Sequence, residues 1–199
     1  MYESLKGTPK DLLTDVPDWV IPKQHELLIG GIETMRLPPT RKLQIATSIS
    51  QLIAQHPDTM LQFTPESLIE QFMDTGNAVV ILDSSKDDRL IGFAKNYLWP
   101  GVNQYGQRVY EFGSWAVFPE YGRNGFGYHL AMLASDAAKA VDPQGQLIAV
   151  CSLENPKPIS MLHQLGAITI TKPSNVQILL GEGNAAVEFI DMSELKYHL

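Results

Sequence analysis

Apolar residues along the chain follow two different spacings, and the change between them separates predicted strands from predicted helices. Residues 109–118 are rich in aromatic and β-branched side chains, which suits a half-buried strand. Pro119 ends that pattern because proline cannot continue a strand ladder. From Phe126 apolar residues recur at helical spacing as far as residue 140. The segment 109–140 is therefore predicted to run as strand, glycine-rich turn and helix.

Further strands are predicted on both sides of this segment. Residues 77–82 and 90–97 are apolar runs separated by a charged turn, which indicates an antiparallel hairpin. A second turn leads into the strand that begins at Val109 and adds it as a third antiparallel strand. Residues 145–152 read as a short buried strand, and the intervening helix makes it parallel to the Val109 strand. The remaining elements are expected as helices at 40–55, 65–73 and 158–165, and as strands near 26–36, 168–171 and 185–191.

The length fits one α/β domain over residues 1–199. Residues 1–40 contain several prolines between apolar residues and are expected to pack on the domain as an arm. Covering a substrate site or forming a dimer contact are alternative roles for this arm. A homodimer formed through the arm or the final strands remains open.

The formal net charge of -7 argues against a nucleic-acid partner and favours cationic substrates such as amines. The single cysteine, Cys151, excludes an internal disulfide and is consistent with a reducing compartment. No apolar stretch is long enough for a membrane span, and the first residues lack the pattern of a secretion signal. We therefore expect a cytoplasmic protein without a membrane or nucleic-acid partner.

The turn between the Val109 strand and the helix holds Gly122, Gly125 and Gly127. The first turn of a helix exposes unpaired N–H groups that attract phosphate, and glycines let a diphosphate approach the backbone. An equally weighted alternative is that these glycines only fix backbone angles or allow close helix packing. The order of the glycines does not fit a dinucleotide fold, and a P-loop would need Lys followed by Ser or Thr where Tyr128 and His129 follow Gly127.

Residues 116–127, AVFPEYGRNGFG, resemble the acetyl-CoA loop of the GNAT superfamily of N-acetyltransferases. In that family a strand ends in a Pro-Glu-Tyr-like turn, and a Q/R-x-x-G-x-G/A loop binds the coenzyme A pyrophosphate. Gly122 stands where the family has Gln or Arg, and Arg123 follows one place later. Residues 155–167, NPKPISMLHQLGA, resemble the second family signature, so the resemblance is strongest over 77–167.

The resemblance implies a mixed, mostly antiparallel sheet flanked by helices, with one parallel βαβ unit at the acetyl-CoA site. It also implies an oxyanion donor among the backbone N–H groups near Val117 and a contact between Asn155 and the pantetheine arm, although Asn155 also fits a plain helix cap. The coenzyme-binding candidates are Val117, Phe118, Gly122, Arg123, Asn124, Gly125, Phe126, Gly127, Tyr128, Asn155 and Ser160.

Acetyl transfer to an amine needs a base for the amine, and Glu111 lies at the spacing where some family members carry a catalytic glutamate. The alternative for Glu111 is a residue at the solvent edge of its strand. The family's frequent general-acid tyrosine falls on Leu162, which cannot donate a proton, and its neighbour His163 is a weaker candidate acid. Cys151 lies in an apolar run typical of a buried core residue. No metal-ligand spacing occurs among the histidines, so we expect no metal.

Together these features predict an acetyl-CoA-dependent N-acetyltransferase in which a primary amine, from a small molecule or a peptide, attacks the thioester directly. The alternative is a catalytically weak or inactive acyl-CoA-binding module, which Leu162 in place of tyrosine favours. The acceptor itself has no recognisable sequence signature.

Overall fold

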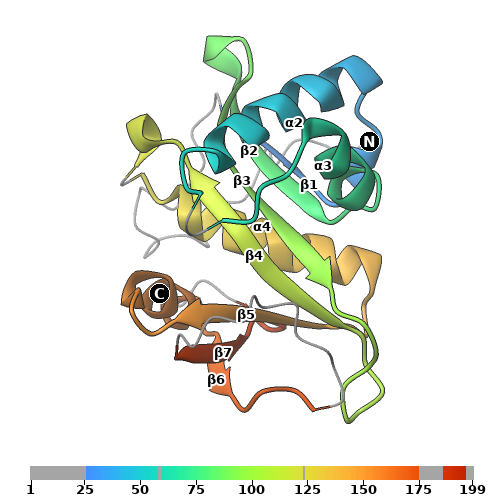
Figure 1. Ribbon diagram of the computed structural model, residues 1–199, viewed down its shortest axis with the longest axis vertical. Coiled ribbons are helices and arrows are strands. Elements are labelled where there is room, and N and C mark those ends of the chain that lie inside the picture. The colour runs from blue at the N-terminus through green and yellow to red at the C-terminus, as the bar shows by residue number, and fades with distance from the viewer. Residues whose placement is uncertain (1–25, 58–59, 123, 175–185, 196–199) are drawn as a thin grey trace, which may run out of the picture.

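The structure is a computed structural model that describes residues 26–57, 60–122, 124–174 and 186–195. Most of the predicted N-terminal arm lies outside these residues, and so does Arg123. The described strands form a single sheet in the order β1-β2-β3-β4-β5-β7-β6 (Figure 1). Their bounds are β1 Glu26–Gly30, β2 Ala78–Asp83, β3 Arg89–Leu98, β4 Val109–Val117, β5 Gln146–Ser152, β6 Ile168–Ile170 and β7 Val187–Asp191.

The strand pairing is antiparallel except between β4 and β5, which run parallel. The predicted hairpin is β2 and β3, and the predicted third antiparallel strand is β4. The parallel pair arises because α4 (Phe126–Val141) carries the chain from the end of β4 back to the start of β5. The mixed, mostly antiparallel sheet with one βαβ unit is therefore confirmed.

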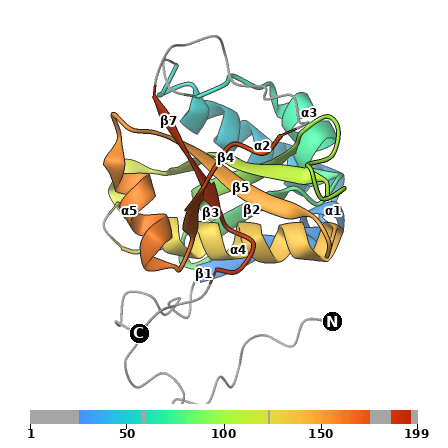
Figure 2. The same cartoon turned by 90° about the horizontal axis from the view of Figure 1, so that it is seen from below.

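Helices cover both faces of the sheet (Figure 2). On one face, α4 packs across β1 to β4, and α5 packs against β5, β7 and α4. On the other face, α2 and α3 pack beside β3. The remaining bounds are α1 Ile32–Met35, α2 Pro39–Ile53, α3 Pro65–Leu68, its π-helical continuation Ile69–Met73, and α5 Pro156–Gln164.

Each face of the sheet has its own hydrophobic core. The helical spacing predicted for α4 places Phe126, Leu130 and Ala134 against the sheet, where they are buried. On the opposite face, Ile49 and Leu52 of α2 are buried with the apolar residues of β2. Apolar side chains are therefore buried on both faces of the sheet.

One predicted strand and one predicted helix differ from the structure at their ends, and another predicted helix differs in its helix type. The predicted strand at 26–36 stops at Gly30, because Gly31 takes a left-handed φ of 55° and the short helix α1 follows. The helix predicted at 158–165 begins earlier, at Pro156, because proline is tolerated in the first turn of a helix. The helix predicted at 65–73 begins as expected, with the Thr64 side chain accepting a hydrogen bond from the N–H of Ser67 at 3.2 Å, and becomes π-helical at Ile69.

Within the part of the chain that the structure describes, none of the helices has the length and apolar character needed to cross a membrane.

Candidate active site

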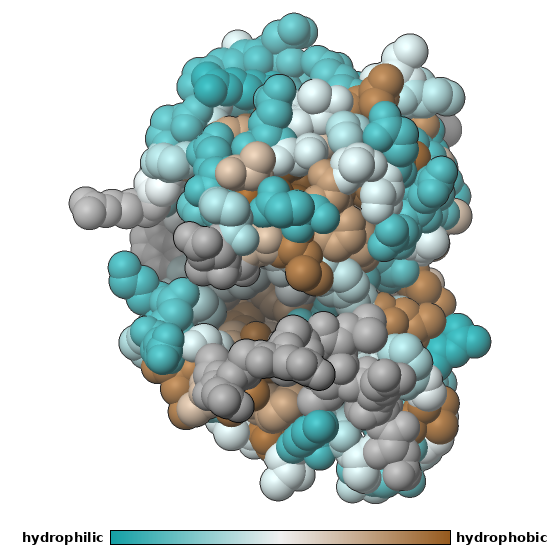
Figure 3. Space-filling view, in the orientation of Figure 1, coloured by the Kyte–Doolittle hydropathy of each residue, from teal (hydrophilic) through white to brown (hydrophobic). Residues whose placement is uncertain are grey.

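The strands β4 and β5 separate along half of their length. Ladder pairs join Val109–Phe112 to residues 146–149, whereas β4 continues to Val117 and the rest of β5 pairs with β7. Among the described residues, none forms a ladder pair with the β5-facing edge of β4 from residue 113 onward. A space-filling view of this face shows a hollow across the molecule, partly lined by hydrophobic residues (Figure 3). The end of this pairing leaves an opening between the two strands at this edge of β4.

A β-bulge in β4 begins where the strands separate. Phe93 pairs with Ala116 and Lys95 pairs with Gly113, so two residues of β4 lie opposite one residue of β3. Ser114 at the bulge has a left-handed φ of 46°, a conformation that is costly for a residue with a side chain. A strained bulge at this position re-aims the strand and turns its second half away from β5.

After the bulge, the backbone N–H groups of Val117 and Phe118 point to opposite edges of β4. The N–H of Phe118 donates to the carbonyl of Ile91 in β3 at 2.9 Å. Because successive N–H groups along a strand point to opposite edges, the N–H of Val117 is directed towards the side where β5 has separated. A backbone donor at that open edge suits an oxyanion, and the resemblance to the GNAT family implies such a donor near Val117.

The predicted phosphate loop lies between β4 and α4. Pro119–Tyr121 forms one 3₁₀ turn, in which buried Tyr121 donates its hydroxyl to Asp83 at 3.3 Å and so fixes the turn to the β2–β3 hairpin. The amide of Asn124 donates to the carbonyls of Tyr121 and Gly122 at 3.1 and 3.2 Å. Within the described part of the chain, no side chain caps the N-terminus of α4, whose N-cap residue is Gly125. The positive end of the helix dipole is therefore open towards the loop.

The three glycines of the loop differ in what they do. Gly125 has a φ of 76°, which a residue with a side chain rarely adopts. A Cβ on Gly127 would lie 2.9 Å from the Trp115 ring and 3.2 Å from the Met161 sulfur, so this glycine allows Trp115 to pack against the helix. Gly122 has an ordinary extended φ of -58° and a tight but not forbidden neighbour, the carbonyl of Pro119 at 3.1 Å. The backbone angle thus explains why residue 125 is glycine, and close packing explains why residue 127 is glycine. Neither explanation applies to Gly122.

Glu111 lies in the ladder-paired half of β4 and points away from α4. Its carboxylate accepts a hydrogen bond from the indole N–H of Trp99 at 2.7 Å, and Trp99 itself is buried. Burial raises the pKa of Glu111, whereas the hydrogen bond from Trp99 and the charge of Lys95 act in the opposite direction. A half-buried carboxylate with a raised pKa is suited to accept a proton. The alternative of a residue at the solvent edge of the strand does not hold.

Sequence reasoning missed Lys95, which is also on this face. Its side chain is 1% exposed, and its Nζ atom lies over the rings of Phe63, Phe72 and Tyr97 at 3.3, 4.5 and 4.7 Å from their centroids. Tyr97 reaches the bulge, with its hydroxyl 3.4 Å from the Ser114 hydroxyl. The signal in the sequence was the alternation of Phe93, Lys95 and Tyr97, which puts a lysine on an apolar face of a strand.

The candidates on α5 lie on the other side of the sheet from Glu111. Leu162, at the family's tyrosine position, is fully buried against the α4 core. The His163 ring is held by the carbonyl of Ala167 at 2.8 Å and by the Glu188 carboxylate at 3.3 Å. His163 is thus bound to the β6–β7 side of the molecule, and the structure does not bring it together with Glu111.

The remaining coenzyme candidates on the helices lie at different places: Asn155 precedes α5, Ser160 lies within it, and Tyr128 is in the first turn of α4. Asn155 is the N-cap residue of α5, but its side chain makes no capping hydrogen bond, and Asn155 and Ser160 are both exposed. Tyr128 in the first turn of α4 donates its hydroxyl to Gln164 of α5. This hydrogen bond joins α5 to the helix end that opens on the glycine loop.

Cys151 is buried in the α4 core, as predicted, and burial raises its pKa to about 11, with the negative charges of Glu188 and Glu111 adding to the effect. A thiol in this state is not a nucleophile at neutral pH. Among the residues that the structure describes, no group of histidine, cysteine and carboxylate side chains could hold a metal ion.

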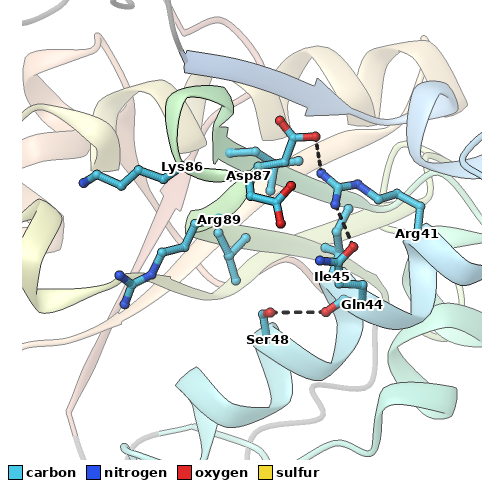
Figure 4. Close-up of a pocket in the computed structure, with 10 residues that line it drawn as sticks. Arg41, Gln44, Ile45, Ser48, Lys86, Asp87 and Arg89 are labelled. Atoms are coloured by element: carbon cyan, nitrogen blue, oxygen red, sulfur yellow. Dashed lines mark hydrogen bonds and ion pairs between the residues drawn. The ribbon is translucent and has the colours of Figure 1, made fainter.

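A pocket of about 260 Å³ lies beside the β2–β3 hairpin, away from the opening between β4 and β5. In Figure 4, Arg41 lies on the opposite side of this pocket from Lys86 and Arg89. Each cation already has an acidic partner: Arg41 contacts Asp88 at 2.5 Å, Arg89 contacts Glu120 at 2.6 Å, and Lys86 contacts Asp83 at 3.5 Å. A pocket whose positive charges are paired in this way is a poor site for a diphosphate.

Comparison with known proteins agrees with this geometry. The family described as "Acetyltransferase (GNAT) family" matches residues 46–167, more than half of the chain, and the chain belongs to this family. No curated protein matches the sequence.

Solved structures share the fold at low sequence identity. A putative acetyltransferase of Salmonella typhimurium with acetyl-CoA is 15% identical, covers 87% of this chain and 95% of its own, and gives a TM-score of 0.58. A spermidine N-acetyltransferase of Vibrio cholerae in complex with CoA and spermine gives 0.54 at 15% identity, with 85% and 95% covered. An Arabidopsis thaliana protein in complex with the bisubstrate analogue CoA-Ac-MVNAL gives 0.54 at 11% identity, with 84% and 97% covered.

Proposed function

We propose that this chain transfers an acetyl group from acetyl-CoA to a primary amine, and that the amine attacks the thioester directly. The observation that carries the proposal is the opening between β4 and β5, with the bulge at its start and the uncapped end of α4 beside it. This arrangement offers backbone donors to a diphosphate at one end and an open strand edge to an acyl group at the other.

The coenzyme would be held mainly by backbone. The loop from Gly122 to Tyr128 would receive the diphosphate on the N–H groups of the first turn of α4. The exposed side chains of Asn155 and Ser160 on α5 would border the pantetheine arm. Arg123, outside the described residues, would add a positive charge to the same loop.

On the acceptor side, Glu111 would take the proton from the attacking amine, directly or through a water molecule. Its raised pKa increases its affinity for that proton, and the Trp99 hydrogen bond fixes the orientation of its carboxylate. The N–H of Val117 would donate to the carbonyl oxygen as negative charge develops on it.

Direct attack is favoured over an acyl-enzyme because the one cysteine near the site is buried and has a raised pKa. The departing thiolate would be protonated by water, since Leu162 cannot donate a proton and His163 is held on the opposite side of the sheet. Water is an adequate acid for a thiol whose pKa is about 8.5, by analogy with free cysteine.

The proposal is tested by measuring free thiol released from acetyl-CoA with spermidine and with a short peptide that has a free N-terminus. We expect release that depends on the amine in the wild type. Glu111→Gln keeps an acceptor for the Trp99 indole, so it removes the base without removing that contact. We expect it to lower kcat/KM by about 10² to 10⁴ at neutral pH.

Tight coenzyme binding without amine-dependent thiol release would instead favour the alternative of a non-catalytic acyl-CoA-binding module. A Glu111→Gln variant with wild-type kcat/KM at every pH would remove Glu111 from the mechanism and leave the acetyltransferase assignment standing.

A further inference from the structure

Lys95 is a buried lysine that lies close to Glu111 on the same face of the sheet. Its partner across the β3–β4 ladder is Gly113, and Tyr97, two residues along β3, is the partner of Glu111. Lys95 and Glu111 are therefore diagonal neighbours on the same face of adjacent strands. Among the described residues, the Nζ atom of Lys95 has no hydrogen-bond partner, although it is fully buried. A buried amine without such a partner is costly to the fold and calls for a reason.

The surroundings of Lys95 identify Glu111 as the group with which it interacts. Phe63 from the segment before α3 and Phe72 from the π-helical turn cover the amine with apolar rings. Tyr97, on the same strand as Lys95, also faces the amine. Burial raises the pKa of Tyr97 to about 12, so its hydroxyl is neutral at physiological pH. Glu111 faces the amine from β4, and its negative charge favours the protonated amine.

The charge of the amine responds to pH in the physiological range. Burial lowers the pKa of Lys95 to about 6, and the Glu111 carboxylate only partly opposes this. Above that pH the amine is neutral, and Glu111 is a carboxylate without a cation beside it. Below it, the amine carries a positive charge, which acts against the negative charge of an ionised Glu111. Protonation of Lys95 therefore changes the net charge of the pair by one.

We propose that Lys95 is a positioning residue of the acceptor site, which acts through Glu111 by setting the net charge that this face of the sheet presents to a cationic amine. The inference rests on the proposed role of Glu111 as the base. With Lys95 neutral, the unpaired Glu111 carboxylate attracts the acceptor's ammonium group and accepts its proton, which leaves the neutral amine to attack. With Lys95 protonated, its charge repels the acceptor and lowers the affinity of Glu111 for the proton.

The experiment compares wild type with Lys95→Met, which has a similar length and no charge. We measure kcat/KM between pH 6 and pH 8 with acetyl-CoA and spermidine as a cationic probe, a window chosen to limit the titration of Glu111 itself. The ratio of the variant's kcat/KM to that of the wild type cancels the titration of the acceptor itself. We expect this ratio to rise about twofold from pH 8 to pH 6, because about half of wild-type Lys95 is protonated at pH 6.

The possible outcomes separate the two proposals. A wild type that releases thiol, with a ratio that stays constant with pH, would show that Lys95 is only a packing residue and would overturn this inference alone. A folded wild type that binds acetyl-CoA but releases no thiol with any amine would overturn the proposed function and this role with it.

A second measurement covers the case in which the variant does not fold. In wild-type protein labelled with ¹³C at the lysine ε carbon, one lysine resonance should titrate near pH 6. If every lysine titrates in the ordinary range, the amine is always protonated and the inference fails.

Discussion

The burial of Lys95 predicts how the stability of the protein depends on pH. The amine has a pKa of about 6 in the folded protein against 10.5 for an ordinary lysine. Because the folded value is the lower one, the unfolded chain binds more protons between these two values, and stability rises with pH across that window. The stability associated with this group is present above about pH 10.5 and is lost as the pH falls towards 6.

Lys95→Met removes the titrating group and should remove its share of the pH dependence. One proton difference between the folded and unfolded states changes the unfolding free energy by about 1.4 kcal/mol per pH unit. The unfolding free energy of Lys95→Met minus that of the wild type should therefore fall by about 4 kcal/mol between pH 7 and pH 10. Urea denaturation at several pH values measures this difference. A change in packing that is the same at every pH does not affect the slope of the difference against pH.

A matched control is Lys157→Met, which changes an exposed lysine of α5. This control makes the same replacement of lysine by methionine at a position where the side chain is not buried, so it measures the effect of the replacement itself. If Lys95→Met behaves like this control, Lys95 is protonated in the folded protein at all these pH values, and the reasoning from its burial is refuted.

Two further substitutions test contacts around the site. Gly127→Ala should lower the unfolding free energy by about 1 to 3 kcal/mol, because its Cβ would lie 2.9 Å from the Trp115 ring, and thermal or urea unfolding measures this. Unchanged stability would mean that Trp115 is free to move away. Trp99→Phe removes the N–H donor of Glu111 and should raise the pKa of that carboxyl further, so the acidic limb of the kcat/KM profile should move to higher pH. If the acidic limb of the kcat/KM profile lies at the same pH in Trp99→Phe as in the wild type, Glu111 is not the group that titrates there.

Local sequence patterns predicted the unit of β4, α4 and β5 well. The strand and helix of residues 109–140 are physically distinct in their apolar spacing, and Pro119 marks the boundary between them. The parallel pairing followed from the rule for βαβ connections. The short helix after Gly31 was missed, because a positive φ at one glycine cannot be read from apolar spacing.

The features of the site that were missed depend on contacts between distant segments. The rings around Lys95 come from Phe63 and Phe72, more than twenty residues away, and the lysine on its own resembles any polar residue in a strand. The bulge at Ser114 depends on a register shift against β3, for which the sequence of β4 alone has no signal. His163 and Glu111 come from opposite sides of the sheet, which neither motif could indicate.

Binding of acetyl-CoA at the loop before α4 is the central claim. Gly125 is unsuitable for testing it, since its φ of 76° makes any side chain there a folding problem. Gly122 has an ordinary backbone conformation, so Gly122→Glu and Gly122→Gln place side chains of equal size there that differ only in charge. A carboxylate within a few ångströms of a diphosphate should cost about 1 to 2 kcal/mol at a partly exposed site.

We would measure acetyl-CoA binding by calorimetry for the wild type and both variants. We expect binding by the wild type, similar affinity for Gly122→Gln, and affinity about tenfold weaker for Gly122→Glu. A folded wild type that does not bind acetyl-CoA, or two variants that bind it equally well, would contradict the claim that this loop holds the diphosphate.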